Sequence, residues 1–319
     1  MLKVKQLAVA YGHGASRMAA VRGVDFEVPR GAAVALVGES GSGKSTIALS
    51  IMRLIDANIG EITGGDVLFE GESLVSATRN RMREVLHKAI GYVPQDPMTA
   101  LDPLCTIGRH IDETLTSAVP KNRRKAAIAE LLESLGMPQS ASRLGSYPHE
   151  MSGGLKQRVA IATALAREPR LIIADEPTSA LDVTTQLAIL RVFHTTMQER
   201  QLSLLFVTHD LLVARALCQQ LVVLYAGRVV ESGATRDLMS SPQHPYTHAL
   251  VKAIPATAAP RSRLFAVPGT AASARSTTDA CQFAPRCPLA DDRCRFEVPP
   301  VIENLSGTVA CWKPGEMAS

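Results

Sequence analysis

Eight residues early in the chain have the types and spacing of a phosphate-binding loop. The stretch Gly38-Glu-Ser-Gly-Ser-Gly-Lys44-Ser45 fits the pattern of a glycine, four residues and then Gly-Lys-Ser/Thr. Its glycines allow backbone N–H groups to turn toward phosphate oxygens, and a following helix would add its positive end. Lys44 would reach the β- and γ-phosphates of a nucleotide, and the Ser45 hydroxyl would ligate Mg²⁺. The residues predicted to contact the nucleotide here are Gly38, Ser40, Gly41, Ser42, Gly43, Lys44, Ser45 and Thr46.

Two adjacent carboxylates follow an apolar run much later in the chain. Leu171–Ala174 is typical of a buried strand, and Asp175 and Glu176 come directly after it. In open α/β sheets, ligands collect at the carboxyl ends of the strands. Asp175 therefore suits the shell of a Mg²⁺ ion, usually through water. Glu176 would orient or deprotonate a water that attacks the γ-phosphate, a role that depends on the phosphate-binding loop being real.

A third group of residues, Ser152-Gly153-Gly154, precedes a predicted helix at Leu155–Arg167. The Ser152 hydroxyl could cap that helix by accepting from its free N–H groups. On this evidence alone, a capped helix with a Gly-Gly hinge accounts for the pattern.

The elements that must position these residues are buried strands and helices. Strands are predicted at Ala33–Val37, Leu171–Ala174, Leu204–Val207 and Leu221–Tyr225. The first strand runs into the phosphate-binding loop, and the loop runs into a helix predicted at Thr46–Ile55. Because helical segments separate the strands, the pattern favours a layered α/β domain with a mostly parallel sheet.

The distance between the two main motifs indicates an insertion. Asp175 lies 131 positions after Lys44, far more than one crossover connection requires. Helical patterns at about 122–135 and 155–167 suggest that the inserted subdomain is largely α-helical.

Composition excludes several classes of protein. The chain has 319 residues, 46% apolar and 20% charged, with a net charge of +4. This mix can bury a sizeable core and is unlike a disordered or collagen-like chain, and the slight basic excess does not demand a nucleic-acid partner. No run approaches the ~20 apolar residues of a membrane helix, and the amino terminus lacks the apolar core of a secretory signal. We therefore expect a soluble, cytosolic chain.

The order of the motifs resembles that of ATP-binding cassette (ABC) ATPases over about residues 1–240. In that family, Ser-Gly-Gly before a helix is the signature motif, and the Asp-Glu strand end follows it. The resemblance implies that Tyr11 stacks on adenine, that Gln95 of Gly91-Tyr-Val-Pro-Gln95 contacts the Mg²⁺ or its water and senses the transmembrane partner, and that His209 contacts the γ-phosphate. Residues Ser179–Asp182 are similar to the family's D-loop.

This resemblance implies a P-loop NTPase cassette over residues 1–253, with a RecA-like parallel sheet core and an inserted α-helical subdomain at about 97–167. Two cassettes of this family sandwich two ATP molecules head to tail, so the complete site needs a second ATPase chain, identical or a paralogue. The phosphate-binding loop of one chain then faces the signature Ser152, Gly153 and Gly154 of the other.

The family pattern also assigns chemistry. It implies catalytic roles for Lys44, Gln95, Glu176 and His209, and a Mg²⁺ ion held by Ser45, Gln95 and Asp175. The chain departs from the family at Leu155, where a glutamine is usual, and carries Gln157 two residues on. We expect activity to survive, because Ser152 and the backbone of Gly154 would make the phosphate contacts.

Residues 254–319 read as a linker, rich in Ala, Ser, Thr and Pro over 256–278, followed by a small Cys-rich extension. Four of the six cysteines crowd this end of the chain: Cys281, Cys287, Cys294 and Cys311. A loop-rich tail of this size buries too little to be stable alone, so a metal is physically reasonable. Four thiolates suit Zn²⁺ and a four-iron cluster equally well.

The stretch Cys281-Gln-Phe-Ala-Pro-Arg-Cys287, with His244-Pro-Tyr-Thr247 upstream, resembles the C-terminal extension of ATPase subunits from oligopeptide and dipeptide importers. That resemblance implies a [4Fe–4S] cluster on the four tail cysteines. It also implies an ATPase that powers import of di- or oligopeptides, bound peripherally to the cytoplasmic face of the plasma membrane. Its partners would be a second ATPase subunit, two membrane permeases and, indirectly, an extracytoplasmic solute-binding protein.

Two alternatives stay open at this point. Sister importers that carry nickel, metal chelates or other solutes are built alike, and the ATPase never touches the cargo. Soluble DNA-repair and ribosome-associated ABC ATPases form a different class, but they usually contain a long coiled coil, a zinc module or two cassettes in one chain, and the sequence has none of these patterns.

Overall fold

The computed structural model describes residues 1–12, 14, 17–179, 181–254, 265–270, 280–304 and 307–318. The chain forms two compact units: unit 1 comprises Met1–Val28, Ala33–Ser76 and Thr208–Ser319, and unit 2 comprises Pro29–Ala32 and Ala77–Val207. The Cys-rich tail thus belongs to the unit that holds the phosphate-binding loop. The linker predicted over residues 256–278 lies largely outside the described residues.

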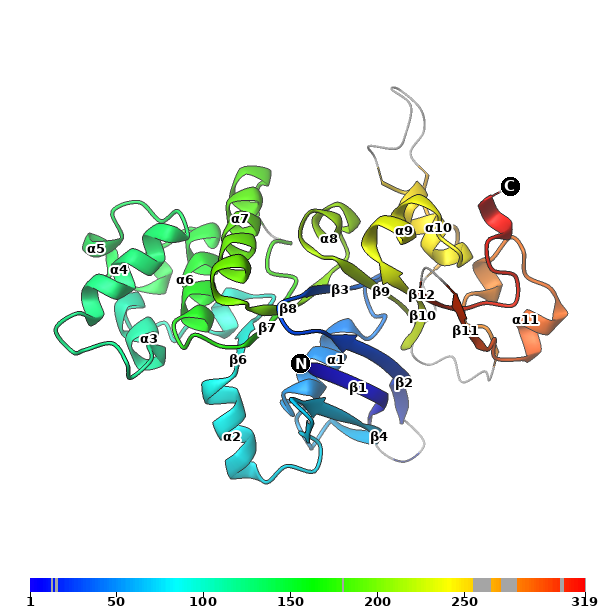
Figure 1. The fold of residues 1–319 in the computed structure, drawn as a ribbon, viewed down its shortest axis with the longest axis horizontal. Coiled ribbons are helices and arrows are strands. Elements are labelled where there is room, and N and C mark those ends of the chain that lie inside the picture. Colours follow the sequence, from blue (N-terminus) through cyan, green and yellow to red (C-terminus); the bar gives the residue numbers. More distant parts are fainter. Residues whose placement is uncertain are drawn as a thin grey trace. The chain divides into compact units, whose positions relative to one another are not determined.

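Unit 1 begins with an antiparallel sheet that the sequence pattern does not predict. Its strands are β1 (Leu2–Tyr11), β2 (Met18–Val28), β4 (Gly60–Phe69) and β5 (Glu72–Ser73), in the order β2-β1-β4-β5 (Figure 1). Leu2, Val4, Leu7 and Val9 of β1 are all at most 1% exposed. The register shifts between Val4 and Leu7, where Gln6 adopts a φ of +45°. Because this bulge interrupts the two-residue alternation, β1 does not read as a regular strand.

The second sheet of unit 1 carries both the phosphate-binding loop and the tail. The fully buried strand β3 (Ala33–Val37) pairs in parallel with β9 (Gln220–Tyr225). Three antiparallel strands continue this sheet in the order β10 (Arg228–Ala234), β12 (Gly307–Ala310) and β11 (Val301–Asn304). The tail thus supplies the last two strands on this side of the sheet, with β12 next to β10 and β11 beyond it (Figure 1).

The helices of unit 1 include the one that follows the phosphate-binding loop. They are α1 (Lys44–Ile51), α8 (Leu211–Leu217), α9 (Thr235–Ser240), α10 (Pro245–Lys252) and α11 (Asp292–Phe296), with a 3₁₀ turn at Ala284–Arg286. The first is shorter than predicted, ending at Ile51 and not at Ile55. Arg53 adopts a φ of +52°, and the N–H of Leu54 turns back to the carbonyl of Leu49 at 2.9 Å. A left-handed residue of this kind closes the last turn of a helix.

Unit 2 combines parallel strands with a group of helices. Its strands β6 (Ile90–Val93), β7 (Leu171–Asp175) and β8 (Ser203–Thr208) pair in parallel in that order. Its helices are α2 (Arg79–Lys88), α3 (Ile107–Thr114), α4 (Arg124–Ser134), α5 (Ser140–Arg143), α6 (Gly153–Leu165) and α7 (Val183–Arg200). Figure 1 shows α3 to α6 grouped together; a short 3₁₀ turn at Pro97–Thr99 precedes α3 in sequence, and another at Pro148–Glu150 precedes α6.

The four strands predicted from apolar runs are all formed, as β3, β7, β8 and β9, each within one residue of its predicted bounds. The prediction of a mostly parallel sheet is incomplete, because unit 1 adds the antiparallel strands of its first sheet and of the tail. α6 begins at Gly153, two residues before the predicted start, and ends at Leu165. Over the described residues, no helix has both the length and the apolar content to cross a membrane.

Candidate functional site

The phosphate-binding loop leaves the end of β3 and enters α1 through two glycines in the left-handed region. Gly41 has a φ of +78°, and Gly43, the N-cap of α1, has a φ of +104°. A Cβ on Gly43 would lie 2.7 Å from the carbonyl oxygen of Ala20, which no side chain can accommodate without a backbone shift. Position 43 therefore needs a glycine, both for its positive φ and because a side chain would have no room.

Lys44 and Ser42 place polar atoms inside this loop. The Lys44 side chain is 5% exposed, and its Nζ donates to the carbonyls of Gly38 at 2.8 Å and Glu39 at 3.0 Å. Ser42 is 4% exposed, and its Oγ has no hydrogen-bond partner among the described residues. A buried hydroxyl without a partner costs stability. An ammonium and an orphaned hydroxyl in one glycine-lined loop fit the oxygens of a bound polyphosphate.

Tyr11 and His209 are the other predicted nucleotide contacts in unit 1. The Tyr11 hydroxyl donates to Thr46 Oγ1 at 3.3 Å, which places Tyr11 next to the first turn of α1. Its ring lies against Gly60, where a Cβ would approach a ring carbon to 2.5 Å. His209 is exposed and follows β8. The cap of α8 is Asp210, whose carboxylate accepts from Leu212 N at 2.8 Å, so His209 is neither a helix cap nor a core residue.

In unit 2, Asp175 ends β7 as a buried carboxylate, 3% exposed. Burial raises the pKa of the neighbouring Tyr92 to about 12, and the negative charge of Asp175 adds to that rise. A buried carboxylate at the carboxyl end of a strand is well placed to hold a cation.

Glu176 turns away from the strand and meets Gln95. It adopts a φ of +44°, a strained conformation for a non-glycine residue, and its N–H donates to the carbonyl of Val207 at 2.9 Å. The amide Nε2 of Gln95 lies 3.5 Å from Glu176 Oε2, at the outer limit of a hydrogen bond. The structure therefore brings together two residues that are 81 positions apart in sequence and that share a predicted catalytic role.

The predicted signature occupies the start of α6. Ser152 takes the N-cap position, but its exposed hydroxyl accepts no bond from the described N–H groups of this helix. The side-chain capping role considered for Ser152 is therefore wrong. A Cβ on Gly154 would lie 3.3 Å from the Thr185 methyl, so the signature packs closely on α7. Asp182, of the D-loop, caps α7 by accepting from Thr185 N at 3.0 Å.

Comparisons with known proteins agree with this geometry. A profile described as ABC transporter matches residues 21–179, and one described as oligopeptide/dipeptide transporter, C-terminal region, matches residues 230–294. The dipeptide transport ATP-binding protein of Escherichia coli is 40% identical over 301 residues, covering 94% of this chain and 92% of that protein. This chain belongs to the ABC transporter ATP-binding family. The oligopeptide transport ATP-binding protein of Bacillus subtilis is 39% identical, covering 98% of this chain and 96% of that protein.

Solved structures of ABC cassettes show the same fold. A dimeric ATP-binding cassette in a post-hydrolysis state, bound to ADP and Pi, matches with a TM-score of 0.67 at 30% identity, covering 74% of this chain and 99% of that chain. A component of an ABC transporter complex from Clostridium perfringens matches in fold with a TM-score of 0.63 at 24% identity, covering 75% of this chain and 90% of that chain. The predicted P-loop NTPase cassette fold is confirmed.

The tail of this ABC subunit contains the cysteines predicted to bind a metal. All six cysteines, each within the described residues, are free thiols. Burial raises the pKa of Cys281 and Cys287, and that of Cys311 to about 11. In the described part of the chain, no group of three or more His, Cys, Asp or Glu is arranged to hold a metal ion. The arrangement therefore does not support the predicted cluster or zinc ion on Cys281, Cys287, Cys294 and Cys311.

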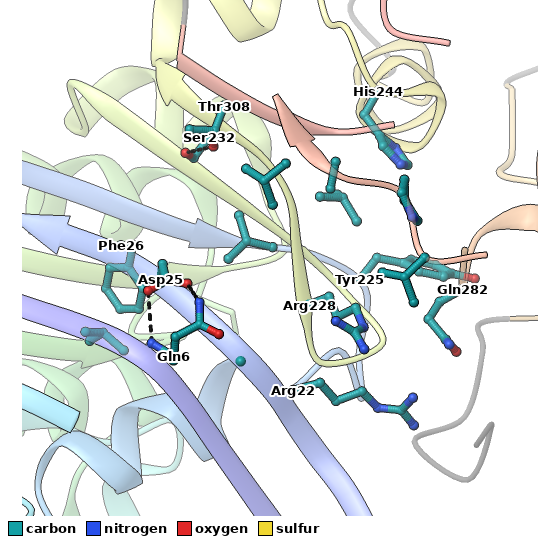
Figure 2. A pocket seen from close by; sticks show the side chains of 18 of the residues that line it. Gln6, Arg22, Asp25, Phe26, Tyr225, Arg228, Ser232, His244, Gln282 and Thr308 are labelled. Atoms are coloured by element: carbon teal, nitrogen blue, oxygen red, sulfur yellow. Dashed lines mark hydrogen bonds between the residues drawn. The ribbon is translucent and has the colours of Figure 1, made fainter. Parts of the chain in front are cut away.

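A cavity of about 630 Å³ in unit 1 lies between the first sheet and the tail of the ABC subunit. Figure 2 shows Gln6, Asp25 and Phe26 on one side of it and Tyr225, His244 and Gln282 on the other. The residues predicted to bind ATP are not among those that line it. The cavity therefore shares no lining residue with the predicted ATP-binding motifs.

Sequence reasoning gave no role to Gln157 beyond noting its place near the signature. Its side chain is 3% exposed, and its Nε2 has no hydrogen-bond partner among the described residues. It lines a cavity of about 190 Å³ in unit 2 together with Gln95, Gly153 and Glu176. The available signal was periodicity, because Gln157 lies one helical turn before the buried Ile161 on the inward face of α6.

Proposed function

We propose that this chain is the ATP-hydrolysing subunit of an ABC importer of di- or oligopeptides. The observation that carries the proposal is the phosphate-binding loop, in which the buried Lys44 ammonium and the orphaned Ser42 hydroxyl share one glycine-lined turn. Family membership supports ATP hydrolysis, and the printed functions of two relatives, dipeptide and oligopeptide transport, support the cargo. The profile of the oligopeptide/dipeptide transporter C-terminal region favours peptides over nickel or metal chelates.

In this proposal each motif contributes one function. The loop N–H groups and Lys44 hold the β- and γ-phosphates, and Tyr11 stacks on the adenine. The Ser45 hydroxyl would ligate Mg²⁺, and Asp175 and Gln95 would supply further ligands directly or through water. A bound Mg²⁺ would neutralise charge that develops on the phosphates.

Hydrolysis itself depends on Glu176 and His209. Glu176 orients or deprotonates the attacking water, and His209 contacts the γ-phosphate. The contact between Gln95 and Glu176 supports this assignment, because it places an amide donor beside the carboxylate that would act on the water.

The same proposal includes a second cassette. The signature Ser152, Gly153 and Gly154 would contact the ATP held by the phosphate-binding loop of a partner chain, identical or a paralogue. Support comes from the exposed Ser152 hydroxyl, which its own helix does not use, and from the dimeric cassette among the structural neighbours. Two permeases would bind this pair at the cytoplasmic face of the plasma membrane, supplied by an extracytoplasmic binding protein. For the tail, the sequence motif alone supports a metal, so the ATPase proposal makes no use of one.

Uptake by cells tests the cargo. Deleting the gene is expected to reduce uptake of labelled di- and tripeptides, and the native chain should restore it. A Lys44→Ala chain should not, because it lacks the phosphate-binding ammonium. Normal peptide uptake in the deletion strain, together with lost nickel uptake, would contradict the peptide assignment and favour the metal-carrying importers.

A further inference from the structure

An arginine from the Cys-rich tail reaches the phosphate-binding loop. Arg286, next to Cys287, donates from Nη1 to Glu39 Oε2 at 2.7 Å and from Nη2 to Glu39 Oε1 at 2.9 Å. Glu39 is the second residue of the loop, 247 positions earlier in the chain. Two parallel N–H···O bonds between a guanidinium and a carboxylate are among the strongest and most directional contacts in proteins. All of these residues belong to unit 1.

Arg286 is fixed in place by its other contacts. Its side chain is 5% exposed, its Nε donates to the carbonyl of Pro268 at 2.6 Å, and Nη1 lies 3.3 Å from the Tyr225 hydroxyl. The guanidinium also lies 5.7 Å from the ring centre of Tyr225 and 5.8 Å from that of Phe283. These contacts use the planar fork of an arginine, which a lysine cannot reproduce.

Glu39 is held from several directions. Its N–H donates to the hydroxyl oxygen of the buried Tyr246 at 2.9 Å, and its carbonyl accepts from Lys44 Nζ at 3.0 Å. One residue therefore joins the tail arginine, through its carboxylate, to the loop lysine, through its carbonyl. A movement of Glu39 would displace a hydrogen bond made by Lys44.

The platform beneath this pair contains residues of both the cassette and the tail. The rings of Tyr225, Tyr246 and Phe283 are 4.6 to 5.4 Å apart between centres, and His244 packs on Phe283 at 5.9 Å. Figure 2 shows Tyr225 and His244 from the side of the neighbouring cavity. Because Phe283 lies in the same tail turn as Arg286, the seating of that turn fixes the position of the guanidinium.

Charge gives the contact a consequence for ligand binding. Glu39 is an acidic side chain, 25% exposed, within a loop whose proposed ligand is a polyanion. An uncompensated carboxylate there would repel phosphate oxygens, and the Arg286 guanidinium cancels that charge. An ion pair so little exposed is screened by solvent much less than a surface pair.

We propose that Arg286 is a positioning residue of the ATP site: it neutralises and orients Glu39, and so couples the seating of the Cys-rich tail to the affinity of the phosphate-binding loop for ATP. This inference rests on the proposed ATPase function. It names a role for the tail that does not need a metal.

The test uses the full chain with Arg286→Gln, Glu39→Gln and the double variant. Arg286→Gln should weaken ATP binding about tenfold and raise KM in proportion, with kcat changed less than about twofold, because the loss is one of binding. Adding Glu39→Gln should recover most of the affinity, since it removes the carboxylate that the arginine compensates. Arg295→Gln, an exposed arginine of the same tail, is the matched control and should bind ATP like the native chain.

Each other outcome overturns the coupling. An unchanged ATP affinity in Arg286→Gln would contradict it. If the double variant binds ATP as weakly as Arg286→Gln, the arginine has a structural role alone. If Arg286→Gln does not fold, Arg286→Lys gives the same comparison, because a lysine donates from one nitrogen and leaves one carboxylate oxygen unpaired. Native affinity in that variant would contradict the need for the fork. A native chain that neither binds nor hydrolyses ATP would instead contradict the proposed function.

Discussion

The side-chain amide of Gln95 lies 3.5 Å from the carboxylate of Glu176 because their strands pair in register. Val93 of β6 is opposite Ala174 of β7, and Gln95 and Glu176 each lie two residues beyond that pair. Parallel strands end at the same edge of a sheet, so the two side chains leave it together. The left-handed conformation of Glu176 then turns the chain out of the strand direction. The pair thus follows from topology, and its role can be tested by substitution.

Replacing Glu176 by glutamine should separate binding from hydrolysis. The amide keeps the size of the side chain but cannot accept a proton, so we expect ATP affinity close to native and kcat lower by about 10² to 10⁴. Steady-state hydrolysis and fluorescent-nucleotide binding measure the two quantities. Glu199→Gln, on the exposed end of α7, is the control and should hydrolyse ATP normally. Native turnover in Glu176→Gln would remove Glu176 from its assigned role.

Replacing Ser42 by alanine should have opposite effects on the free and the ATP-bound chain. The buried Oγ has no partner among the described residues, so its removal should leave the free chain as stable or more stable by about 1 kcal/mol. With ATP and Mg²⁺ present, the native chain should gain more thermal stability than the variant, because its hydroxyl then has a phosphate partner. Thermal unfolding with and without nucleotide measures both effects. An equal gain in the two chains would show that Ser42 does not contact the ligand.

The strands and the loop could be predicted because their signals are local. The run Ala33–Val37 is apolar throughout and ends at a glycine motif, which identifies both a buried strand and the phosphate-binding loop. Strand β1 was not predicted, because the bulge at Gln6 interrupts the alternation of buried and exposed residues in the middle of the strand. The left-handed conformation of Arg53, which ends α1 early, has no sequence signal, since arginine rarely adopts it.

Long-range contacts of the site could not be predicted in the same way. The partnership of Glu39 with Arg286 joins two ordinary surface-type residues through the fold of the tail. The spacing of the tail cysteines also does not show how the fold arranges them, and the described residues contain no group of three arranged to hold a metal ion. The described residues thus leave the predicted cluster unsupported, whereas Gly41 and Gly43 of the loop have the left-handed conformations that a tight turn requires.

The two signature glycines should respond differently to alanine. A Cβ on Gly154 would lie 3.3 Å from Thr185, whereas a Cβ on Gly153 meets no described atom within 4 Å beyond its own helix and chain neighbours. Gly153→Ala should therefore raise the free energy of unfolding by about 0.5 to 1 kcal/mol, because alanine is the better helix former. Gly154→Ala should lose that gain and displace Thr185, which the D-loop residue Asp182 holds. Urea unfolding compares them, and equal stabilisation by both substitutions would contradict the close packing.

Acid should destabilise the chain through His244. Burial lowers the pKa of His244 to about 3 from an ordinary 6.5. Below pH 6.5 the imidazole is therefore protonated in the unfolded chain while it stays neutral in the folded chain. The stability that depends on a neutral His244 is complete above pH 6.5 and falls as the pH drops toward 3. At pH 5 the loss is about 2 kcal/mol, from about 1.4 kcal/mol per pH unit.

The matched variant is His244→Asn. Asparagine can still accept the Tyr246 N–H that His244 Nδ1 accepts at 3.0 Å, but it does not titrate. Between pH 7.5 and pH 5, the free energy of unfolding of this variant, measured in urea, should fall by about 2 kcal/mol less than that of the native chain. The carboxylate of the nearby Glu231 accepts the backbone N–H of His244, and burial raises the pKa of Glu231. This group acts in the opposite sense and is common to both chains. His87→Asn, on the exposed face of α2, should keep the native pH dependence, and a His244→Asn chain that also keeps it would show that His244 can be protonated in the folded state.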